Sequence, residues 1–251
     1  MPNLRFAAPV EQRVALITGG AKGIGHATAL RLSEAGRHIA IADVQDEAGE
    51  KTVQKIQQTG QQALYMHTDV TSEKSVQTCV QKTLDTFGRL DILVCCAGIL
   101  GFEKSFLEQP VEQFDKVMKI NMYGIYHAHQ AAIPHMIKRG WGRCVTISSG
   151  ARHGGPNQVP YCVSKGAVYS FIGSLGNAFS KQGVFVNGVE PGRVLTDMVV
   201  PRFSPEHIAN PGNPLGRYAD PEELAEVIEF LTSERNTYTT GAVWSVKGAT
   251  G

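Results

Sequence analysis

Short apolar segments alternate with longer helical stretches along the chain. The apolar segments have the length of β-strands, and several are apolar throughout, as expected of strands covered on both faces of a sheet. They span residues 14–18, 39–43, 63–67, 92–96, 144–148, 184–189 and 242–246. The helical stretches span residues 23–35, 46–59, 72–87, 111–138, 161–181 and 221–232. This alternation predicts an α/β fold: a single Rossmann-type, doubly wound domain with a mostly parallel seven-stranded sheet flanked by helices.

The chain shows no linker that would divide it into domains. No Pro- or Ser-rich tract, charge block or low-complexity segment interrupts it, so we expect one domain over residues 1–251. The least regular stretch, 195–218, holds four prolines and two glycines. A loop of that length inside a compact domain is usually a lid or binding loop. We therefore expect this segment to cover a substrate.

Composition and charge exclude several classes of function. Lys and Arg number 24 against 23 Asp and Glu, so the net charge of +1 gives no field for nucleic acid. No segment approaches the roughly 20 apolar residues of a membrane span, and residues 1–13 lack the apolar core of a signal peptide. The five cysteines lack the spacing of a zinc site, so we expect no metal and a reducing, cytoplasmic location.

A glycine-rich turn follows the first apolar segment. Residues 18–25 read TGGAKGIG, and a helical stretch begins inside them. Glycine lets the backbone approach a pyrophosphate, and the helix N-terminus offers free N–H groups and a positive dipole end to that anion. The spacing differs from the G-x-G-x-x-G of many dinucleotide sites, and a glycine turn alone also serves plain helix packing.

Asp43 strengthens the prediction of a dinucleotide site. It lies eighteen residues after Gly25, at the end of the second strand, where a carboxylate can bind the adenosine ribose. A ribose phosphate about 4 Å from that carboxylate would be repelled by roughly 4 kcal/mol at an effective dielectric near 20. Lys22 acts in the opposite direction, because its cation could bind that phosphate. Asp43 favours NAD over NADP, and its alternative role is to cap the next helix.

Tyr161 and Lys165 form the second chemical signal. They are four residues apart, and Pro160 suits the first turn of a helix, so both side chains share one helix face. A tyrosine with a pKa near 10 is a poor base, and a neighbouring lysine cation is expected to lower that pKa. Tyr161 could then exchange a proton with an alcohol or carbonyl oxygen while hydride moves.

These motifs, in this order, resemble the single-domain branch of the short-chain dehydrogenase/reductase family. The resemblance runs from about Arg13 to Lys247. It implies catalytic roles for Asn121, which kinks its helix and holds a relay water, for Tyr161 and Lys165, and for a serine that binds the substrate oxygen. The family position favours Ser149, whereas the usual spacing to the tyrosine favours Ser148.

The resemblance also extends the cofactor site. Asp69 and Val70 resemble the pair at the adenine, and Val194 and Thr196 resemble residues that hold the carboxamide. Together with the glycine turn, the implied cofactor site comprises Gly19, Lys22, Gly23, Ile24, Gly25, Asp43, Asp69, Val70, Ala97, Gly98, Tyr161, Lys165, Pro191, Gly192, Val194 and Thr196.

The chain departs from the family pattern at two places. Cys95-Cys96 stand where two asparagines are common, so polar contacts to the cofactor are lost. Lys247 stands near the C-terminus where an aspartate is usual. That end often lies near a subunit interface in this family, and a homo-oligomer, tetramer or dimer, through helices 111–138 and 161–181 is implied.

Three functions follow from the sequence as hypotheses. The leading one is an NAD-dependent oxidoreductase that interconverts a secondary alcohol or polyol and its ketone. An NADPH-dependent oxoacyl-thioester or carbonyl reductase is the alternative, against which Asp43 argues. A nucleotide-sensing scaffold on the same fold is the alternative of another class. We expect specificity to lie in 99–106, 153–159 and 195–218, with Phe102, Phe106 and Met198 as apolar pocket candidates.

Overall fold

The computed structural model describes residues 12–249, so residues 1–11, to which most of the signal-peptide prediction refers, and 250–251 lie outside it. Its seven strands form one sheet in the order β3-β2-β1-β4-β5-β6-β7, and every neighbouring pair is parallel. The strands are β1 (Val14–Thr18), β2 (His38–Asp43), β3 (Ala63–His67), β4 (Ile92–Cys95), β5 (Gly142–Ile147), β6 (Val184–Pro191) and β7 (Val243–Val246). The predicted doubly wound sheet is confirmed, and its order reverses between β1 and β4.

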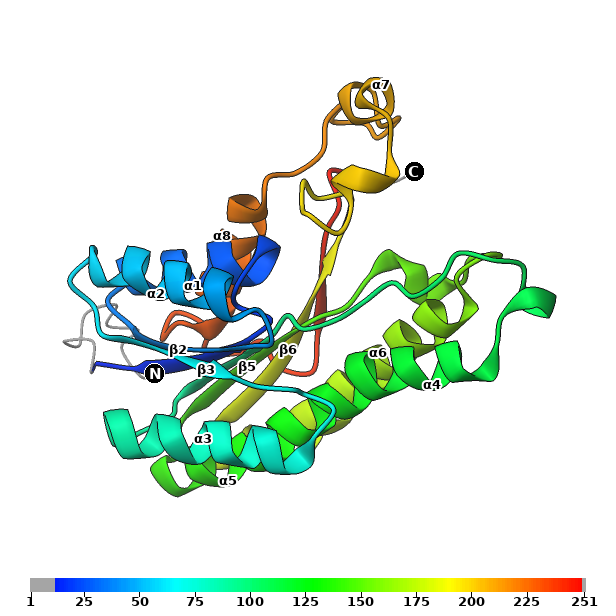
Figure 1. The fold of residues 1–251 in the computed structure, drawn as a ribbon. Helices are drawn as coiled ribbons and strands as arrows, with labels where there is room; N and C mark the ends of the chain where they lie inside the picture. Colours follow the sequence, from blue (N-terminus) through cyan, green and yellow to red (C-terminus); the bar gives the residue numbers. More distant parts are fainter. Residues whose placement is uncertain (1–11, 250–251) are drawn as a thin grey trace.

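The helices lie on both faces of this sheet (Figure 1). The long ones are α1 (Gly23–Glu34), α2 (Asp46–Gln57), α3 (Glu73–Phe87), α4 (Val111–Met118), α5 (Gly124–Arg139), α6 (Val159–Phe179) and α8 (Pro221–Thr232). Short ones are η1 (Phe106–Glu108), η3 (Gly150–His153), η4 (Ser180–Gln182), η5 (Val200–Arg202) and α7 (Pro205–Ala209). None of the helices in residues 12–249 has the length and apolar character needed to cross a membrane.

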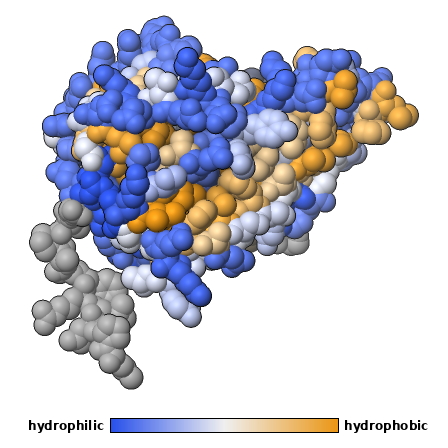
Figure 2. Space-filling view, turned by 90° about the horizontal axis from the view of Figure 1, so that it is seen from below, coloured by the Kyte–Doolittle hydropathy of each residue, from blue (hydrophilic) through white to orange (hydrophobic). Residues whose placement is uncertain are grey.

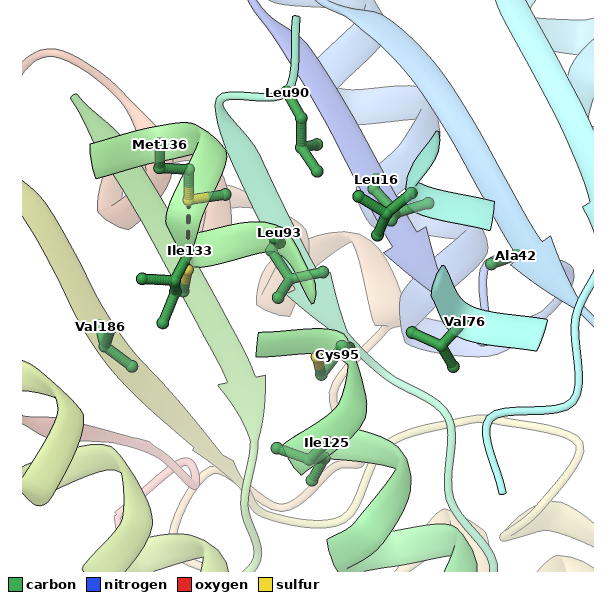
Figure 3. Packing of buried hydrophobic residues seen from close by; sticks show 14 of the residues in the cluster. Leu16, Ala42, Val76, Leu90, Leu93, Cys95, Ile125, Ile133, Met136 and Val186 are labelled. Atoms are coloured by element: carbon green, nitrogen blue, oxygen red, sulfur yellow. Dashed lines mark hydrogen bonds between the residues drawn. The ribbon is translucent and has the colours of Figure 1, made fainter. Parts of the chain in front are cut away.

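Two apolar clusters, one on each face of the sheet, hold the layers together. Alternate strand residues divide between them, since successive side chains of a strand point to opposite faces. Leu16, Leu93 and Cys95 pack with α3, α5 and α6, as Figure 3 shows around Val76, Ile125 and Met136. Another cluster joins the opposite strand faces to α1, α2 and α8. Because both faces are covered, several strands, such as β1 and β4, are buried along their whole length and almost entirely apolar, as the sequence predicted.

The predicted single helix 111–138 is wrong in one respect. A π-helical turn, η2 (Lys119–Tyr123), separates α4 from α5. Asn121 lies within it, fully buried, and its amide binds backbone outside the helix. The helix must widen to direct a short polar side chain at that target, and π-turns are frequent at functional sites. Periodicity alone does not reveal such a widening.

Candidate active site

The glycine turn packs backbone directly on backbone. A Cβ on Gly25 would lie 2.1 Å from the Gly19 carbonyl oxygen, and one on Gly19 would lie 2.5 Å from the Ala97 nitrogen. Gly19 and Gly23 also have φ of +68° and +53°, which glycine adopts without steric cost. The turn therefore needs glycine at these positions, and it brings the ends of β1 and β4 together.

The N-terminus of α1 is open to an anion. Its N-cap residue is Lys22, which makes no side-chain cap, so the first-turn N–H groups point out of the helix without a capping partner. Ile24 packs against the core and anchors this turn. The Lys22 ammonium lies 3.7 Å from a carboxylate oxygen of Asp197 in the 195–218 loop. This geometry fits a bound pyrophosphate at the helix end.

Asp43 holds the glycine turn from the end of β2. Its Oδ2 accepts from the Ala21 N–H at 3.1 Å and its Oδ1 accepts from the Gln45 N–H at 3.1 Å. A carboxylate has about four acceptor positions, so two of them are still able to accept ribose hydroxyls. The alternative of a plain helix cap does not describe it, because α2 has Gln45 as its N-cap and Asp43 bonds the turn as well.

Asp69 and Val70 follow β3 and face different surroundings. Asp69 Oδ1 accepts from the N–H and the hydroxyl of Thr71, which closes a tight local turn. Val70 is buried, and a Cβ on Gly124 of α5 would lie 2.8 Å from its side chain. The pair thus fixes the loop that follows β3.

Cys95 and Cys96 differ in environment, although the sequence predicted both as buried strand residues. Strand β4 ends at Cys95, which is 2% exposed, whereas Cys96 lies beyond it and is partly exposed. Burial raises the pKa of Cys95 to about 12, and burial also raises the pKa of Cys96. Both thiols are therefore neutral near pH 7. Ala97 and Gly98 next to them keep the close backbone approach, and a Cβ on Gly98 would lie 3.3 Å from Asn121 Oδ1.

Asn121 uses its side chain on protein groups. Oδ1 accepts from the Ile99 N–H at 2.8 Å, and Nδ2 donates to the Ile99 carbonyl at 2.8 Å and to the Ser164 hydroxyl at 3.2 Å. The helix disruption that the resemblance implied is present as η2. With these three bonds, the amide joins the loop after β4 to helix α6.

The two serines after β5 point in different directions. Ser148 is 1% exposed and its Oγ is buried without a hydrogen-bond partner among the described residues. Ser149 Oγ accepts from the Ala151 N–H at 3.2 Å, and its hydroxyl is close enough to Tyr161 to lower the pKa of that side chain. The geometry thus favours Ser149 over Ser148 as the serine beside the tyrosine.

Tyr161 and Lys165 share one face of α6, and Pro160 lies in its first turn as predicted. Lys165 Nζ donates to the Ile147 carbonyl at 2.8 Å and lies 5.6 Å from the Tyr161 ring centre. Burial lowers the pKa of Lys165 to about 8. The expected lowering of the Tyr161 pKa by Lys165 is wrong for this structure. Burial raises the pKa of Tyr161 more than the neighbouring Ser149 hydroxyl and the charge of Arg202 lower it.

The segment after β6 returns to the glycine turn. Pro191 ends β6, and the Gly192 N–H donates to the Val246 carbonyl at 2.8 Å. Val194 is buried in the core. Thr196 lies beside the turn, since a Cβ on Gly23 would be 3.3 Å from its methyl carbon.

A cavity of about 470 Å³ opens between the loop after β4, helix α4 and the 195–218 segment. Its lining includes Phe102 and Met198, as expected, but Phe106 is not part of it and its side chain is 66% exposed. No lining residue comes from 153–159. Instead, Asn157 and Gln158 of that segment bond the 99–106 loop, through Lys104 N–H at 3.1 Å and through Glu103.

Sequence reasoning missed two charged groups near the site. Arg202 of η5 lines the cavity and lies close enough to Tyr161 to lower its pKa. Glu190 of β6 is buried between Arg152 and Lys247, both of which contact its carboxylate. Arg202 falls inside the expected lid, which was the only signal for it. The presence of Lys247 where the family usually has an aspartate was the only sequence signal for the buried cluster of Arg152, Glu190 and Lys247.

Known proteins match this chain over almost its whole length. A family model described as enoyl-(acyl carrier protein) reductase matches residues 19–249. L-rhamnose 1-dehydrogenase (NAD(P)(+)) of Sphingomonas sp. (strain SKA58) is 35% identical over 95% of this chain and 96% of its own length. The 3-oxoacyl-(acyl-carrier-protein) reductase FabG of Aquifex aeolicus (strain VF5) is 34% identical over 95% of this chain and 97% of its own length. A crystal structure of NAD+-bound xylitol dehydrogenase has a TM-score of 0.88 at 30% identity, covering 94% of this chain and 98% of that one.

The fold, the site and these similarities define a class. The chain belongs to the short-chain dehydrogenase/reductase family. It is an oxidoreductase of that family, whose members act on alcohol and carbonyl groups.

Proposed function

We propose that this protein is an NAD-dependent dehydrogenase that interconverts a secondary alcohol or polyol and its ketone. The observation that carries the proposal is the arrangement of Ser149, Tyr161 and Lys165: the Lys165 ammonium lies 5.6 Å from the Tyr161 ring centre, and Ser149 is close enough to lower the pKa of Tyr161. Similarity to an L-rhamnose dehydrogenase and to an NAD+-bound xylitol dehydrogenase supports a polyhydroxylated or cyclic substrate.

Each residue has a distinct part in the proposed reaction. Ser149 binds the substrate oxygen, and Tyr161 takes the hydroxyl proton during oxidation or returns it during reduction. When bound, NAD supplies the hydride acceptor and a positive charge. Lys165, fixed by the Ile147 carbonyl, would hold the nicotinamide ribose, and Asn121 positions the loop after β4.

Asp43 supports NAD rather than NADP. Its carboxylate stands at the end of β2 and is held there by two backbone N–H groups, so it cannot turn away from a ribose phosphate. Lys22, the side chain that could bind such a phosphate, pairs with Asp197. The alternative, an NADPH-dependent oxoacyl-thioester reductase, is favoured by the matching family model and the acyl-carrier-protein reductase relative.

We further propose one domain over the chain, with 195–218 as its substrate lid, and a cytoplasmic homo-oligomer, tetramer or dimer. Figure 2 looks onto the helical layer that contains α3 and α5 and shows apolar side chains along its surface. Tyr123, Tyr126, Val163 and Tyr169 are exposed on η2, α5 and α6. Light scattering of the purified protein tests the assembly, and a monomer would contradict it.

The test of the function is formation of NADH from NAD, or of NADPH from NADP, by the purified protein with a panel of polyols, cyclic alcohols and hydroxyacyl esters. Tyr161→Phe is expected to lose at least a thousandfold in kcat, because it removes the proton acceptor and keeps the ring. Tyr169→Phe, on an exposed face of the same helix, is the matched control. Turnover that survives in Tyr161→Phe would refute the mechanism, and turnover with NADP alone would favour the alternative.

A further inference from the structure

The cavity between the loop after β4, helix α4 and the 195–218 segment carries an excess of positive charge. Its charged lining residues are Lys116, Asp197 and Arg202. Asp197 faces the Lys22 ammonium at 3.7 Å, so its charge is compensated from outside the cavity. Among the described residues Lys116 has no ion-pair partner. What the cavity can bind therefore depends on whether the ion-pair partner of Arg202 can be replaced by a ligand.

Arg202 is held by a carboxylate that belongs to a neighbouring loop. Its NH1 donates to Glu103 Oε1 at 2.7 Å, and Gln158 donates to the same oxygen. The side chains of Arg202 and Glu103 are 34% and 46% exposed. Exposed ion pairs of this kind are weak, so a second carboxylate can replace Glu103 without a large loss. Glu103 itself is not among the cavity-lining residues, whereas Arg202 is.

The guanidinium also lies close to the proposed reaction centre. The positive charge of Arg202 lowers the pKa of Tyr161. The rest of the cavity lining mixes polar residues with apolar ones, among them Ile99, Phe102 and Met198. A ligand with a carbon skeleton and an anionic group matches this lining. Arginine matches the planar, two-oxygen geometry of a carboxylate.

We propose that the substrate is a hydroxy acid: a secondary alcohol, or the corresponding ketone, whose carboxylate binds Arg202 and Lys116 and displaces Glu103 from Arg202. This inference rests on the proposed function and narrows its substrate class. Glu103 serves as a substitute carboxylate that keeps the 99–106 loop and η5 together until the substrate arrives.

The experiment compares hydroxy acids with their methyl esters. 3-Hydroxybutyrate, cis-4-hydroxycyclohexanecarboxylate and trans-4-hydroxycyclohexanecarboxylate are each paired with the methyl ester, which keeps the skeleton and removes the charge. We expect the acid-to-ester ratio of kcat/KM to fall at least tenfold in Arg202→Gln and in Lys116→Gln. Arg202→Lys should recover part of the ratio, and the change should lie in KM. Circular dichroism confirms that each variant is folded.

Two further variants separate recognition from a structural role. Glu103→Gln removes the competing carboxylate and should raise the acid-to-ester ratio, which mere loosening of the loop would not do. Lys104→Gln removes a cation that follows Glu103 in the sequence but does not line the cavity. It should leave the acid-to-ester ratio of kcat/KM unchanged. A ratio in Arg202→Gln within twofold of the parent value would overturn the inference, while turnover of the esters would leave the dehydrogenase function standing.

If none of the six compounds is oxidised, isothermal titration calorimetry tests carboxylate binding without requiring turnover. Cyclohexanecarboxylate and cyclohexanecarboxamide are titrated into the protein with NAD present. At least tenfold tighter binding of the carboxylate, lost in Arg202→Gln, would support the inference even though the proposed function had failed. Equal affinity for the two probes would overturn it.

Discussion

The side-chain amide of Asn121 bonds both backbone polar groups of Ile99, accepting from its N–H and donating to its carbonyl, each at 2.8 Å. The pairing imitates one rung of a β-ladder, made by a side chain in a π-turn. It fixes the residue at which the cavity wall begins.

Loss of this pairing should destabilise the protein. Asn121→Ala is expected to lower the free energy of unfolding by about 2–3 kcal/mol, because it leaves partly buried backbone groups of Ile99 unsatisfied. Urea unfolding followed by circular dichroism measures the change. Asn177→Ala, on an exposed part of α6, should change it by less than about 0.5 kcal/mol. Equal midpoints for the two variants would contradict the structural role of Asn121.

Asp43 should control the choice of cofactor. Asp43→Asn keeps a side-chain acceptor and removes the charge, so we expect the NAD-to-NADP ratio of kcat/KM to fall at least tenfold. Asp43→Ala should show a fall of similar size and weaker binding of both cofactors, because the Ala21 and Gln45 N–H groups lose their acceptor. Asp46→Ala removes an exposed carboxylate three residues away and serves as the control. An unchanged ratio in Asp43→Asn would exclude Asp43 as the discriminating group.

The buried ammonium of Lys165 should make stability depend on pH. Burial lowers its pKa from 10.5 to about 8, so the folded protein releases this proton more readily than the unfolded chain. Stability due to this group is reduced below pH 8 and is regained as pH rises from about 8 toward 10.5. Without added cofactor, the unfolding free energy of the parent relative to Lys165→Met should rise by about 2 kcal/mol between pH 7 and 9.5. Urea unfolding of both proteins gives the difference, in which the cysteine contributions cancel. Parallel pH curves would refute the lowered pKa.

The Glu190 cluster should show the opposite pH dependence. Burial alone would raise the pKa of Glu190, but hydrogen bonds from Lys247 and Arg152 hold it below its ordinary value of 4.5. A carboxylate of this kind stabilises the fold above pH 4.5, and this contribution is lost as pH falls through the lowered pKa. Lys247→Met should therefore lower the free energy of unfolding by about 1–3 kcal/mol at pH 7 and by less below pH 4. Lys181→Met, on an exposed surface, should show no such difference. A penalty that is independent of pH would show that lost packing, and not charge, is responsible.

The fold and part of the site could be predicted from sequence because local rules determine them. Runs such as 92–96 indicate buried parallel strands, and the Tyr161–Lys165 spacing places both side chains on one helix face. Hydrophobic periodicity does not predict the π-turn at Asn121, which only the family resemblance implied, because the side chain bonds Ile99, twenty-two residues earlier. Similarly, only the folded chain brings the charge of Arg202 near Tyr161 and places Lys247 against Glu190. The raised pKa of Tyr161 depends on burial, which spacing does not reveal.

The cavity-lining residues and the proton-transfer groups come from different parts of the chain. Ser149, Tyr161 and Lys165 follow β5 or lie in α6, whereas the cavity is lined by 99–102, α4 and 197–202. None of the lining residues belongs to a strand. Substitutions in these loops and in α4 can therefore change which substrate is bound, while the strand pairing and the proton-transfer residues stay the same. For protein engineering, libraries confined to 197–202 are a direct route to dehydrogenases of new specificity on this framework.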